Sequence, residues 1–296
     1  MLSRSGVPVR LIGRELHVEA IARDGLLLHG LRIHERIPLA ATTSIAEGVR
    51  DAGVILFCVK TVSTESTARE MRPFLEPKAT ILSFQNGIDN IDRIHSAIRL
   101  HAIPTAVYVA AEMTAPGCVT HTGRGDLVIG YHAGWPRQPD LEPLAAMFEQ
   151  AEIPCRISEE IAIELWTKLV MNCAYNAVSA LTRAQYGRVV RSEPVRDFCM
   201  RAIGETIAVA RAEGVFLSEQ VVAEAALRLA EKMTGATSSM AQDIARGRPT
   251  EIDSLNGYVA RCGKLLGIAT PVSDILTEMV KLLEESAVVS KADADS

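Results

Sequence analysis

The feature that most constrains the fold is a change of pattern near residues 156–159. Before it, short β-rich segments alternate with helical or loop segments; after it, helical patterns follow one another without β-rich segments. Alternating strands and helices are typical of a parallel sheet covered by helices. The sequence therefore predicts an α/β domain with a parallel sheet over residues 1–157 and an all-helical domain over residues 158–296.

Several segments of the first part have the composition of strands. Gly53–Lys60 is apolar from Gly53 to Val59 without alternation, as expected of a strand that is covered on both faces. Cys118–His121 and Leu127–Tyr131 are separated by Gly123 and Gly125, and this spacing predicts a hairpin or a turn at the sheet edge. The other clear strands are Val7–Ile12, Thr80–Gln85 and Thr105–Ala110.

Helices of the second part are predicted from apolar periodicity, with Ser, Thr or Pro at several starts. They cover Ser158–Thr182, Pro194–Glu213, Ser218–Met233, Ser239–Arg246, Thr250–Leu266 and Pro271–Glu285.

Composition excludes several classes of function. The net charge is −5 and no basic run is present, which argues against binding to nucleic acid or to an anionic membrane. The longest apolar stretches are far shorter than the roughly 20 residues of a spanning helix. Six scattered cysteines form no C-x-x-C pair, which argues against a metal site or disulfide framework. We expect a cytoplasmic protein with a small-molecule partner and no metal; its oligomeric state is left open, a homodimer included.

The start of the sequence suggests that an element is missing. Val7–Ile12 followed by Gly13-Arg14 is similar to the second strand of a dinucleotide-binding Rossmann unit, where a charged residue just past the strand reads the adenosine ribose. No strand and no G-x-G-x-x-G loop precede it. We expect the natural protein to begin about 25 residues earlier, since a whole βαβ unit takes about 30 residues or more. The alternative is a true deletion that leaves a nonfunctional remnant.

A row of polar residues marks the first helix of the second part. Lys168, Asn172 and Asn176 stand four residues apart in the apolar run from Ser158 to Leu181, so they share one stripe of a helix. The stripe is either the polar face of an amphipathic helix or the wall of a site.

Together, these features resemble the ketopantoate reductase family (2-dehydropantoate 2-reductase) from Ser5 to Glu284. The motifs that carry the resemblance are Val59-Lys60-Thr61; Gln85-Asn86-Gly87; Glu112-Met113 with Pro116-Gly117 and His121; Lys168 with Asn172 and Asn176; Ser238-Ser239-Met240-Ala241-Gln242-Asp243; and Thr250-Glu251-Ile252-Asp253 with Asn256-Gly257. The resemblance implies a Rossmann domain without its first strand, followed by an all-helical domain, and the reduction of a 2-oxo acid with NADPH.

The resemblance also assigns roles to residues of the chemical step. Lys168 is expected to protonate the alkoxide that forms when hydride reaches the carbonyl carbon, and Glu251 to hold the ammonium in place. Asn172 and Asn176 are expected to orient the substrate through their amides. Ser239 opens a helix, where a hydroxyl beside backbone N–H groups suits the substrate carboxylate. Glu251 is otherwise explained as a first-turn acid that complements a helix dipole.

Cofactor binding is assigned to Arg14, Lys60, Asn86 and Glu251, with Asn86 also near the substrate. Arg14 stands where an NAD-specific protein carries an acid, and a guanidinium suits the 2′-phosphate of NADPH. The alternative explanation of Arg14 is a surface residue that starts a helix. The alternative explanation of Lys60 is an ordinary cation at the end of a strand.

The implied reaction is the NADPH-dependent reduction of 2-dehydropantoate to pantoate, on the route to pantothenate and coenzyme A. Ala236 departs from the polar residue expected near Ser239 in ketopantoate reductases proper. The alternative substrate is therefore another small 2-oxo acid. A further alternative is a truncated, non-catalytic relative that binds the cofactor poorly.

Overall fold

A computed structural model describes residues 1–30, 33–137 and 139–294, with side chains described as far as Ser286. The chain divides into two compact units. The sheet unit comprises Met1–Gln85 and Asn90–Ile161, and the helical unit comprises Asn86–Asp89 together with the residues from Ala162 onward. The predicted class, an α/β domain followed by an all-helical domain, is confirmed. The short segment Asn86–Asp89 leaves the sheet unit and packs with the helices.

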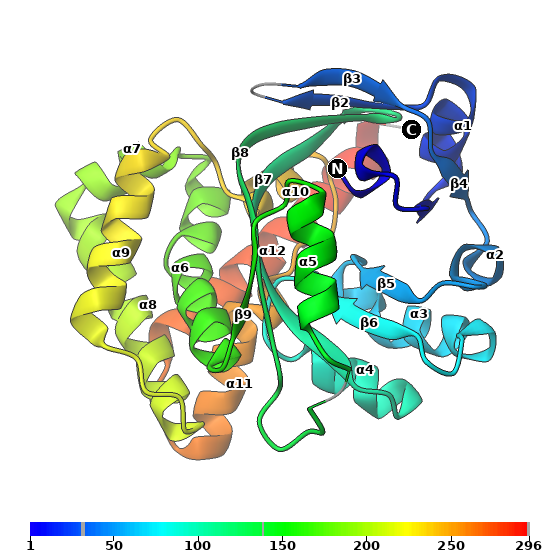
Figure 1. Ribbon diagram of the computed structural model, residues 1–296. Helices are drawn as coiled ribbons and strands as arrows, with labels where there is room; N and C mark the ends of the chain where they lie inside the picture. The colour runs from blue at the N-terminus through cyan, green and yellow to red at the C-terminus, as the bar shows by residue number, and fades with distance from the viewer. Residues whose placement is uncertain (31–32, 138, 295–296) are drawn as a thin grey trace. The chain divides into compact units, whose positions relative to one another are not determined.

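The sheet unit contains one large sheet, with the strand order β3-β2-β8-β7-β6-β5 and with β9 paired to β8. The strands β5, β6 and β7 pair in parallel, whereas β7 and β8 pair antiparallel. The sheet is thus parallel where strands alternate with helices, and it becomes mixed where β7 returns as β8 (Figure 1). The strands are β2 (Leu26–Gly30), β3 (His34–Ile37), β5 (Val54–Phe57), β6 (Thr80–Ser83), β7 (Ala102–Ala115), β8 (Cys118–Gly130) and β9 (Cys155–Ser158).

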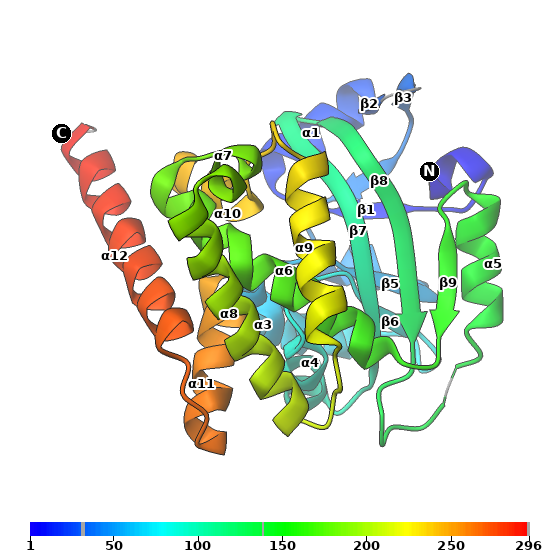
Figure 2. The same cartoon turned by 90° about the vertical axis from the view of Figure 1, so that its left-hand side faces the viewer.

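The hairpin predicted between Cys118–His121 and Leu127–Tyr131 is wrong. Both segments belong to the single strand β8, and the turn lies earlier, at Pro116–Gly117 between β7 and β8 (Figure 2). The register shifts where Ala110 pairs with Gly123, and Arg124 has a φ of 38°. The glycines therefore mark a bulge within a strand, which the sequence alone did not distinguish from a turn.

Helices cover both faces of the large sheet. Ile81 and Leu82 are neighbours on β6 and point to opposite faces, yet they are only 1% and 0% exposed. Ile81 belongs to one apolar cluster with residues of α3 and α4, and Leu82 belongs to another with Phe148 of α5. This explains the uninterrupted apolar composition of the central strands. The helices are α3 (Thr64–Met71), α4 (Asn90–Ile98) and α5 (Glu142–Gln150).

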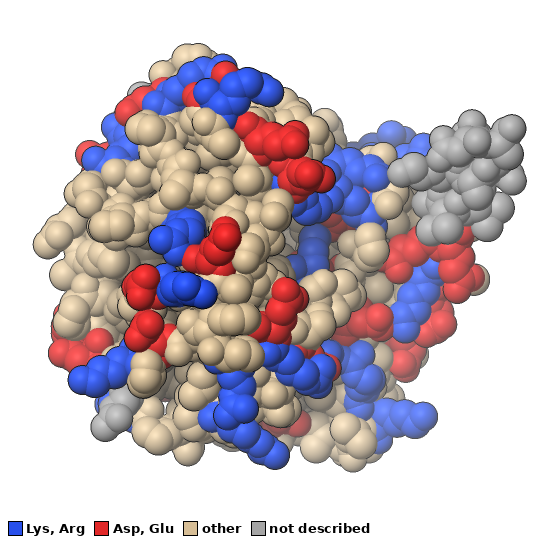
Figure 3. Space-filling view, turned by 90° about the vertical axis from the view of Figure 1, so that its right-hand side faces the viewer, with Lys and Arg blue, Asp and Glu red and all other residues tan. Residues whose placement is uncertain are grey.

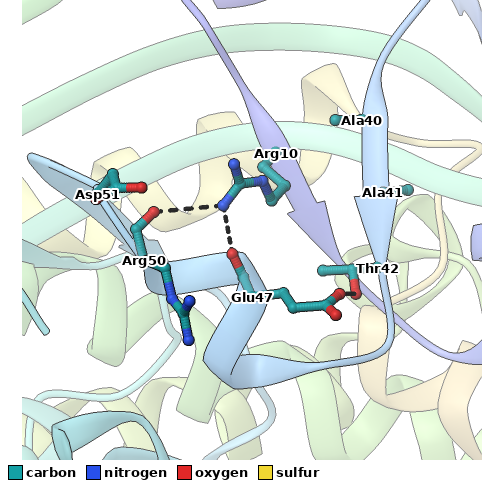
Figure 4. Close-up of a pocket in the computed structure, with 7 residues that line it drawn as sticks. All are labelled: Arg10, Ala40, Ala41, Thr42, Glu47, Arg50 and Asp51. Carbon is teal, nitrogen blue, oxygen red and sulfur yellow. Dashed lines mark hydrogen bonds between the residues drawn. The ribbon is translucent and has the colours of Figure 1, made fainter. Parts of the chain in front are cut away.

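A small second sheet lies in the sheet unit, where β1 (Arg10–Ile12) pairs in parallel with β4 (Ala40–Thr42). Among the described residues, no ladder joins this pair to the large sheet. The helices α1 (Glu15–Asp24) and α2 (Ile45–Val49) flank it. Arg10 donates from Nη1 to the carbonyl oxygens of Glu47 and Arg50 at the end of α2. These residues line an open pocket of about 490 Å³ (Figure 4).

The helical unit is built around α6, whose residues Leu169, Val170, Cys173 and Ala174 are at most 1% exposed. Among the described residues of this unit there is no strand. No described helix of the protein is both long enough and apolar enough to cross a bilayer. The helices are α6 (Ile161–Thr182), α7 (Tyr186–Arg191), α8 (Glu193–Ala212), α9 (Glu219–Lys232), α10 (Ser239–Ala245), η4 (Ile252–Ser254), α11 (Asn256–Leu266) and α12 (Pro271–Ala294).

Two differences from the predicted helices matter for the site. The helix predicted over Thr250–Leu266 is interrupted at Leu255, whose backbone angles (φ −110°, ψ −106°) separate η4 from α11. Glu251 itself precedes η4 as its N-cap residue and is not helical. The helix α7 was not predicted, because it is short and follows a polar segment.

One face of the protein carries charged side chains of both signs. On the face shown in Figure 3, Lys and Arg are interspersed with Asp and Glu. This face therefore carries no broad basic patch of the kind that nucleic acids require.

Candidate active site

The polar stripe of α6 lies at the border of the helical unit's core. Lys168 and Asn172 are half-buried, and Asn176 is only 5% exposed. The apolar residues between them belong to the core cluster of the unit or, as Met171 does, pack against it. The stripe is therefore not the solvated face of an amphipathic surface helix.

Asn86 is held by the geometry of the motif Gln85-Asn86-Gly87 just after β6. Gln85 is buried and donates from Nε2 to Thr64 Oγ1 at 2.7 Å, which anchors the end of the strand. Gly87 has a φ of +87°, and a Cβ atom there would lie 2.9 Å from the carbonyl oxygen of Ser254. Both the left-handed backbone and the close approach require glycine. The motif thereby places Asn86 among the helices.

The Asn86 amide joins a lysine to a glutamate. Its Oδ1 accepts a hydrogen bond from Lys168 Nζ at 3.1 Å, and its Nδ2 donates to Glu251 Oε2 at 3.1 Å. This orientation is chemically required, because an ammonium has only donors and a carboxylate only acceptors. The three side chains are half-buried. The structure thus brings together three of the predicted site residues from distant parts of the sequence.

The environment of Lys168 makes it a stronger acid than an ordinary lysine. Burial disfavours the charged form and lowers the pKa of Lys168 to about 8, while the Glu251 carboxylate acts in the opposite direction and raises it. At neutral pH the ammonium form still predominates. The group therefore holds a proton and releases it more readily than a solvated lysine.

Asn176 and Ser238 connect the stripe to α10. Tyr186 Oη donates to Asn176 Oδ1 at 3.2 Å, and Ser238 Oγ donates to the Asn176 carbonyl oxygen at 3.0 Å. Ser238 Oγ also accepts from Ala241 N at 3.0 Å, which makes Ser238 the N-cap of α10. Ser239 is then the first residue of this helix and is exposed.

The two predicted cofactor cations, Arg14 and Lys60, lie in the sheet unit. Arg14 is the N-cap residue of α1 and follows β1 after Gly13, and Lys60 lies just beyond the end of β5. Both residues are exposed. They follow the carboxyl ends of parallel strands, where ligands bind in open α/β sheets.

The sequence matches the family model described as "Ketopantoate reductase PanE/ApbA" over residues 1–134, and the model of its C-terminal part over residues 160–284. The chain belongs to the ketopantoate reductase family. A 2-dehydropantoate 2-reductase of Halobacterium salinarum is 31% identical over 287 residues, which cover 96% of this chain and 93% of that protein. A similar protein from Pyrococcus horikoshii is 30% identical over 96% of this chain and 92% of its own length.

Solved structures have the same fold as this chain. A PanE/ApbA family ketopantoate reductase from Ralstonia eutropha JMP134 is 43% identical and superposes with a TM-score of 0.90, covering 97% of this chain and 93% of that one. A D-mandelate dehydrogenase in a ternary complex with NADH and anilino(oxo)acetate also has a TM-score of 0.90, but at 24% identity, over 97% of this chain and 93% of its own. The resemblance inferred from the motifs is therefore confirmed at the level of the family.

Within the candidate site, two contacts had no signal in the sequence. Tyr186 binds Asn176, and the Glu284 carboxylate accepts a hydrogen bond from the backbone N–H of Thr250. Both join segments whose local patterns are unremarkable. None of the predicted site residues lines the pocket near Arg10. Among the described side chains, no group of three His, Cys, Asp or Glu residues could hold a metal ion.

Proposed function

We propose that this protein reduces 2-dehydropantoate to pantoate with NADPH, and that Lys168 is the proton donor. The observation that supports the proposal best is the half-buried series Lys168–Asn86–Glu251 in a member of the ketopantoate reductase family. The names of the relatives agree with this reaction.

The proposed role of Lys168 follows from the charge that develops on the substrate. Addition of hydride to the C2 carbonyl converts the C=O double bond to a C–O single bond and leaves the electron pair on oxygen. The Lys168 ammonium transfers one proton to this oxygen, which gives the hydroxyl group of pantoate and a neutral amine. Water then reprotonates the amine. Asn86 accepts a hydrogen bond from Nζ throughout and restricts its position.

Substrate orientation is assigned to the amides of the α6 stripe and to Ser239. Asn176 Oδ1 already accepts from Tyr186, so the group that Asn176 offers to a substrate is its amide Nδ2. Asn172 is half-buried one turn closer to Lys168 and offers both an acceptor and donors. Ser239 is exposed at the first turn of α10, where a hydroxyl suits a carboxylate.

The residues present suit an anionic dinucleotide. Arg14 and Lys60 are exposed cations that follow the carboxyl ends of β1 and β5. We assign Arg14 to the 2′-phosphate and Lys60 to the remainder of the dinucleotide, with Asn86 and Glu251 at the nicotinamide end. NADPH, when bound, supplies the hydride.

In a second candidate function, the reaction is the same but the substrate is another 2-oxo acid. Ala236 replaces the polar residue expected near Ser239. Its carbonyl oxygen accepts from Tyr186 N at 2.9 Å, and its methyl group packs against the core. A less polar neighbourhood favours a 2-oxo acid without the hydroxyl group of 2-dehydropantoate, such as 2-oxoisovalerate.

The experiment is a substrate profile of the purified protein. Oxidation of NADPH is followed by absorbance with 2-dehydropantoate, 2-oxoisovalerate and benzoylformate, and the product is identified by mass spectrometry. We expect the highest kcat/KM with 2-dehydropantoate. A higher value with another acid would favour the second candidate. Weak or undetectable NADPH binding, titrated by fluorescence, together with no turnover of any acid would indicate the truncated, non-catalytic relative.

A further inference from the structure

The segment that carries Glu251 has little regular structure of its own. It follows α10 through Gly247, which has a φ of +60°, and it reaches η4 only at Ile252. Thr250 is 5% exposed, and its Oγ1 accepts a hydrogen bond from Ile252 N at 3.2 Å. This contact spans two residues, so it is local and does not fix the segment relative to the rest of the unit.

A carboxylate on α12 supplies the long-range anchor. Glu284 Oε1 accepts from the backbone N–H of Thr250 at 2.6 Å, across 34 residues of sequence. Glu284 is half-buried. Hydrogen bonds from a backbone N–H to a partly buried carboxylate are short and about twice as strong as neutral ones. The peptide unit between Pro249 and Thr250, one residue before Glu251, is therefore tied to α12.

The helix α12 is itself firmly placed. Val272, Leu276 and Val280 pack into the core with exposures of 8%, 2% and 0%. At its start, the Glu205 carboxylate accepts from the backbone N–H groups of Val272 and Ser273 at 2.8 and 2.9 Å. The anchor of Thr250 is thus a rigid helix and not a flexible surface.

A second contact from α12 lies on the other side of Glu251. Lys281 Nζ lies 2.9 Å from Asp253 Oδ1, in an ion pair whose side chains are 39% and 55% exposed. Lys281 and Glu284 are three residues apart and share one face of the helix. Such an exposed pair contributes little by itself, so the Glu284 contact is the stronger of the two.

We propose that Glu284 is a positioning residue that holds the Glu251 carboxylate against Asn86, and through it the Lys168 ammonium. The inference extends the proposed function and rests on it for the consequence for catalysis. Glu284 contacts Thr250 and not the Lys168–Asn86–Glu251 series itself. Its effect is transmitted through one peptide unit: without the anchor, Glu251 retreats and its field on Lys168 weakens.

Two variants distinguish the effect of the hydrogen bond between Glu284 and Thr250 N from the effect of the Glu284 charge. Glu284→Gln removes the charge but keeps an oxygen that can accept from Thr250 N. Glu284→Asp keeps the charge but retracts the carboxylate by one methylene. If the contact is what matters, kcat should stay near wild type in Glu284→Gln and fall about 10-fold to 100-fold in Glu284→Asp, since misplacement of about 1 Å can have effects of that size. Glu285→Gln is the matched control, because Glu285 is exposed on the same helix.

A measurement without turnover keeps this inference separate from the proposed function. Competitive acetylation of Lys168, followed by mass spectrometry over a pH series, reports the midpoint at which its amine loses the proton. The midpoint should move to lower pH in Glu284→Asp and stay unchanged in Glu284→Gln and Glu285→Gln. Thermal unfolding of each variant checks that the fold is retained.

The outcomes discriminate between the explanations. An unchanged Lys168 midpoint in Glu284→Asp, or a larger shift in Glu284→Gln than in Glu284→Asp, would overturn the positioning role. A loss of thermal stability without any shift of the midpoint would also contradict it, because Glu284 would then be purely structural. If the wild type reduces no 2-oxo acid, the proposed function fails, whereas the acetylation series still decides the role of Glu284.

Discussion

The Lys168 site and the two cations assigned to the cofactor differ in how far their side chains are buried. In the helical unit, Lys168, Asn86 and Glu251 are half-buried and joined by hydrogen bonds of 3.1 Å. In the sheet unit, Arg14 and Lys60 are exposed at strand ends. A preformed polar series is suited to a proton transfer that depends on geometry. Exposed cations are suited to attracting a phosphate, which depends mainly on charge.

This contrast predicts that changes in the helical unit act on the chemical step and changes in the sheet unit on cofactor affinity. The largest effect should come from Lys168→Ala. Removal of the proton donor should lower kcat by about 10² to 10⁴, with the KM for NADPH changed little. Steady-state kinetics with 2-dehydropantoate check this, with Lys264→Ala, an exposed lysine of α11, as control. A loss of only a few fold would remove Lys168 from the role of proton donor.

Preformation of the site can be tested at Gly87. Replacement by Ala must place a Cβ 2.9 Å from the carbonyl oxygen of Ser254 on a backbone with a φ of +87°. We expect Gly87→Ala to lower the free energy of unfolding by about 1–3 kcal/mol and to reduce kcat, because Asn86 moves with it. Chemical denaturation measures the stability.

The control for Gly87 is Gly204 in α8, where a Cβ meets no atom within 4 Å. Gly204→Ala should preserve stability or increase it by about 0.5–1 kcal/mol, since Ala is the better helix former. Equal losses in the two variants would show that Gly87 has no special constraint.

The elements that could be predicted are those whose signal is local. β5 lies within a continuous apolar run, and α6 within a long periodic segment, so both were found in the sequence. The strands β2 and β3 lack such a signal, since β2 reads Leu-Leu-Leu-His-Gly, without β-branched or aromatic residues, and β3 reads His-Glu-Arg-Ile. The bulge in β8 was missed because glycines within a strand have the same composition as glycines in a turn.

The candidate site shows the same limit. The four-residue spacing from Lys168 to Asn176 follows from helix periodicity and is visible in the sequence. The family resemblance placed Glu251 beside Lys168 and placed Asn86 near the cofactor and the substrate. That Asn86 lies between Lys168 and Glu251 is a long-range fact that only the structure showed. The contact of Glu284 with Thr250 could not be predicted, because a side chain that accepts from a distant backbone N–H leaves no pattern in the residues around it.

In the sheet unit, the variant Arg14→Asp tests the assignment of Arg14 to the 2′-phosphate of NADPH. An exposed guanidinium at the 2′-phosphate should be worth about 1.5 kcal/mol, the lower end for hydrogen bonds to charged groups, which is about 10-fold in the KM for NADPH. The KM for NADH should fall relative to it, because a carboxylate suits the bare ribose. Arg23→Asp is the control, since Arg23 is exposed at the other end of α1. An unchanged ratio of kcat/KM for NADPH and NADH would exclude Arg14 from the phosphate site.

The smallest effect we predict is a shift in the pH dependence of the rate. It tests whether the charge of Glu251 acts on the pKa of Lys168. The proton donor is the protonated form of Lys168, whose pKa is about 8. The rate of reduction should therefore fall as the pH rises through about 8, whereas the reverse oxidation, which needs the neutral amine, should rise. The Glu251 carboxylate raises the pKa of Lys168, so Glu251→Gln should move the descending limb to lower pH. Profiles of kcat/KM against pH measure both limbs. A limb that stays in place in Glu251→Gln, or moves to higher pH, would mean that the charge of Glu251 does not act on the proton donor, and that the hydrogen bonds through Asn86 serve only to align it.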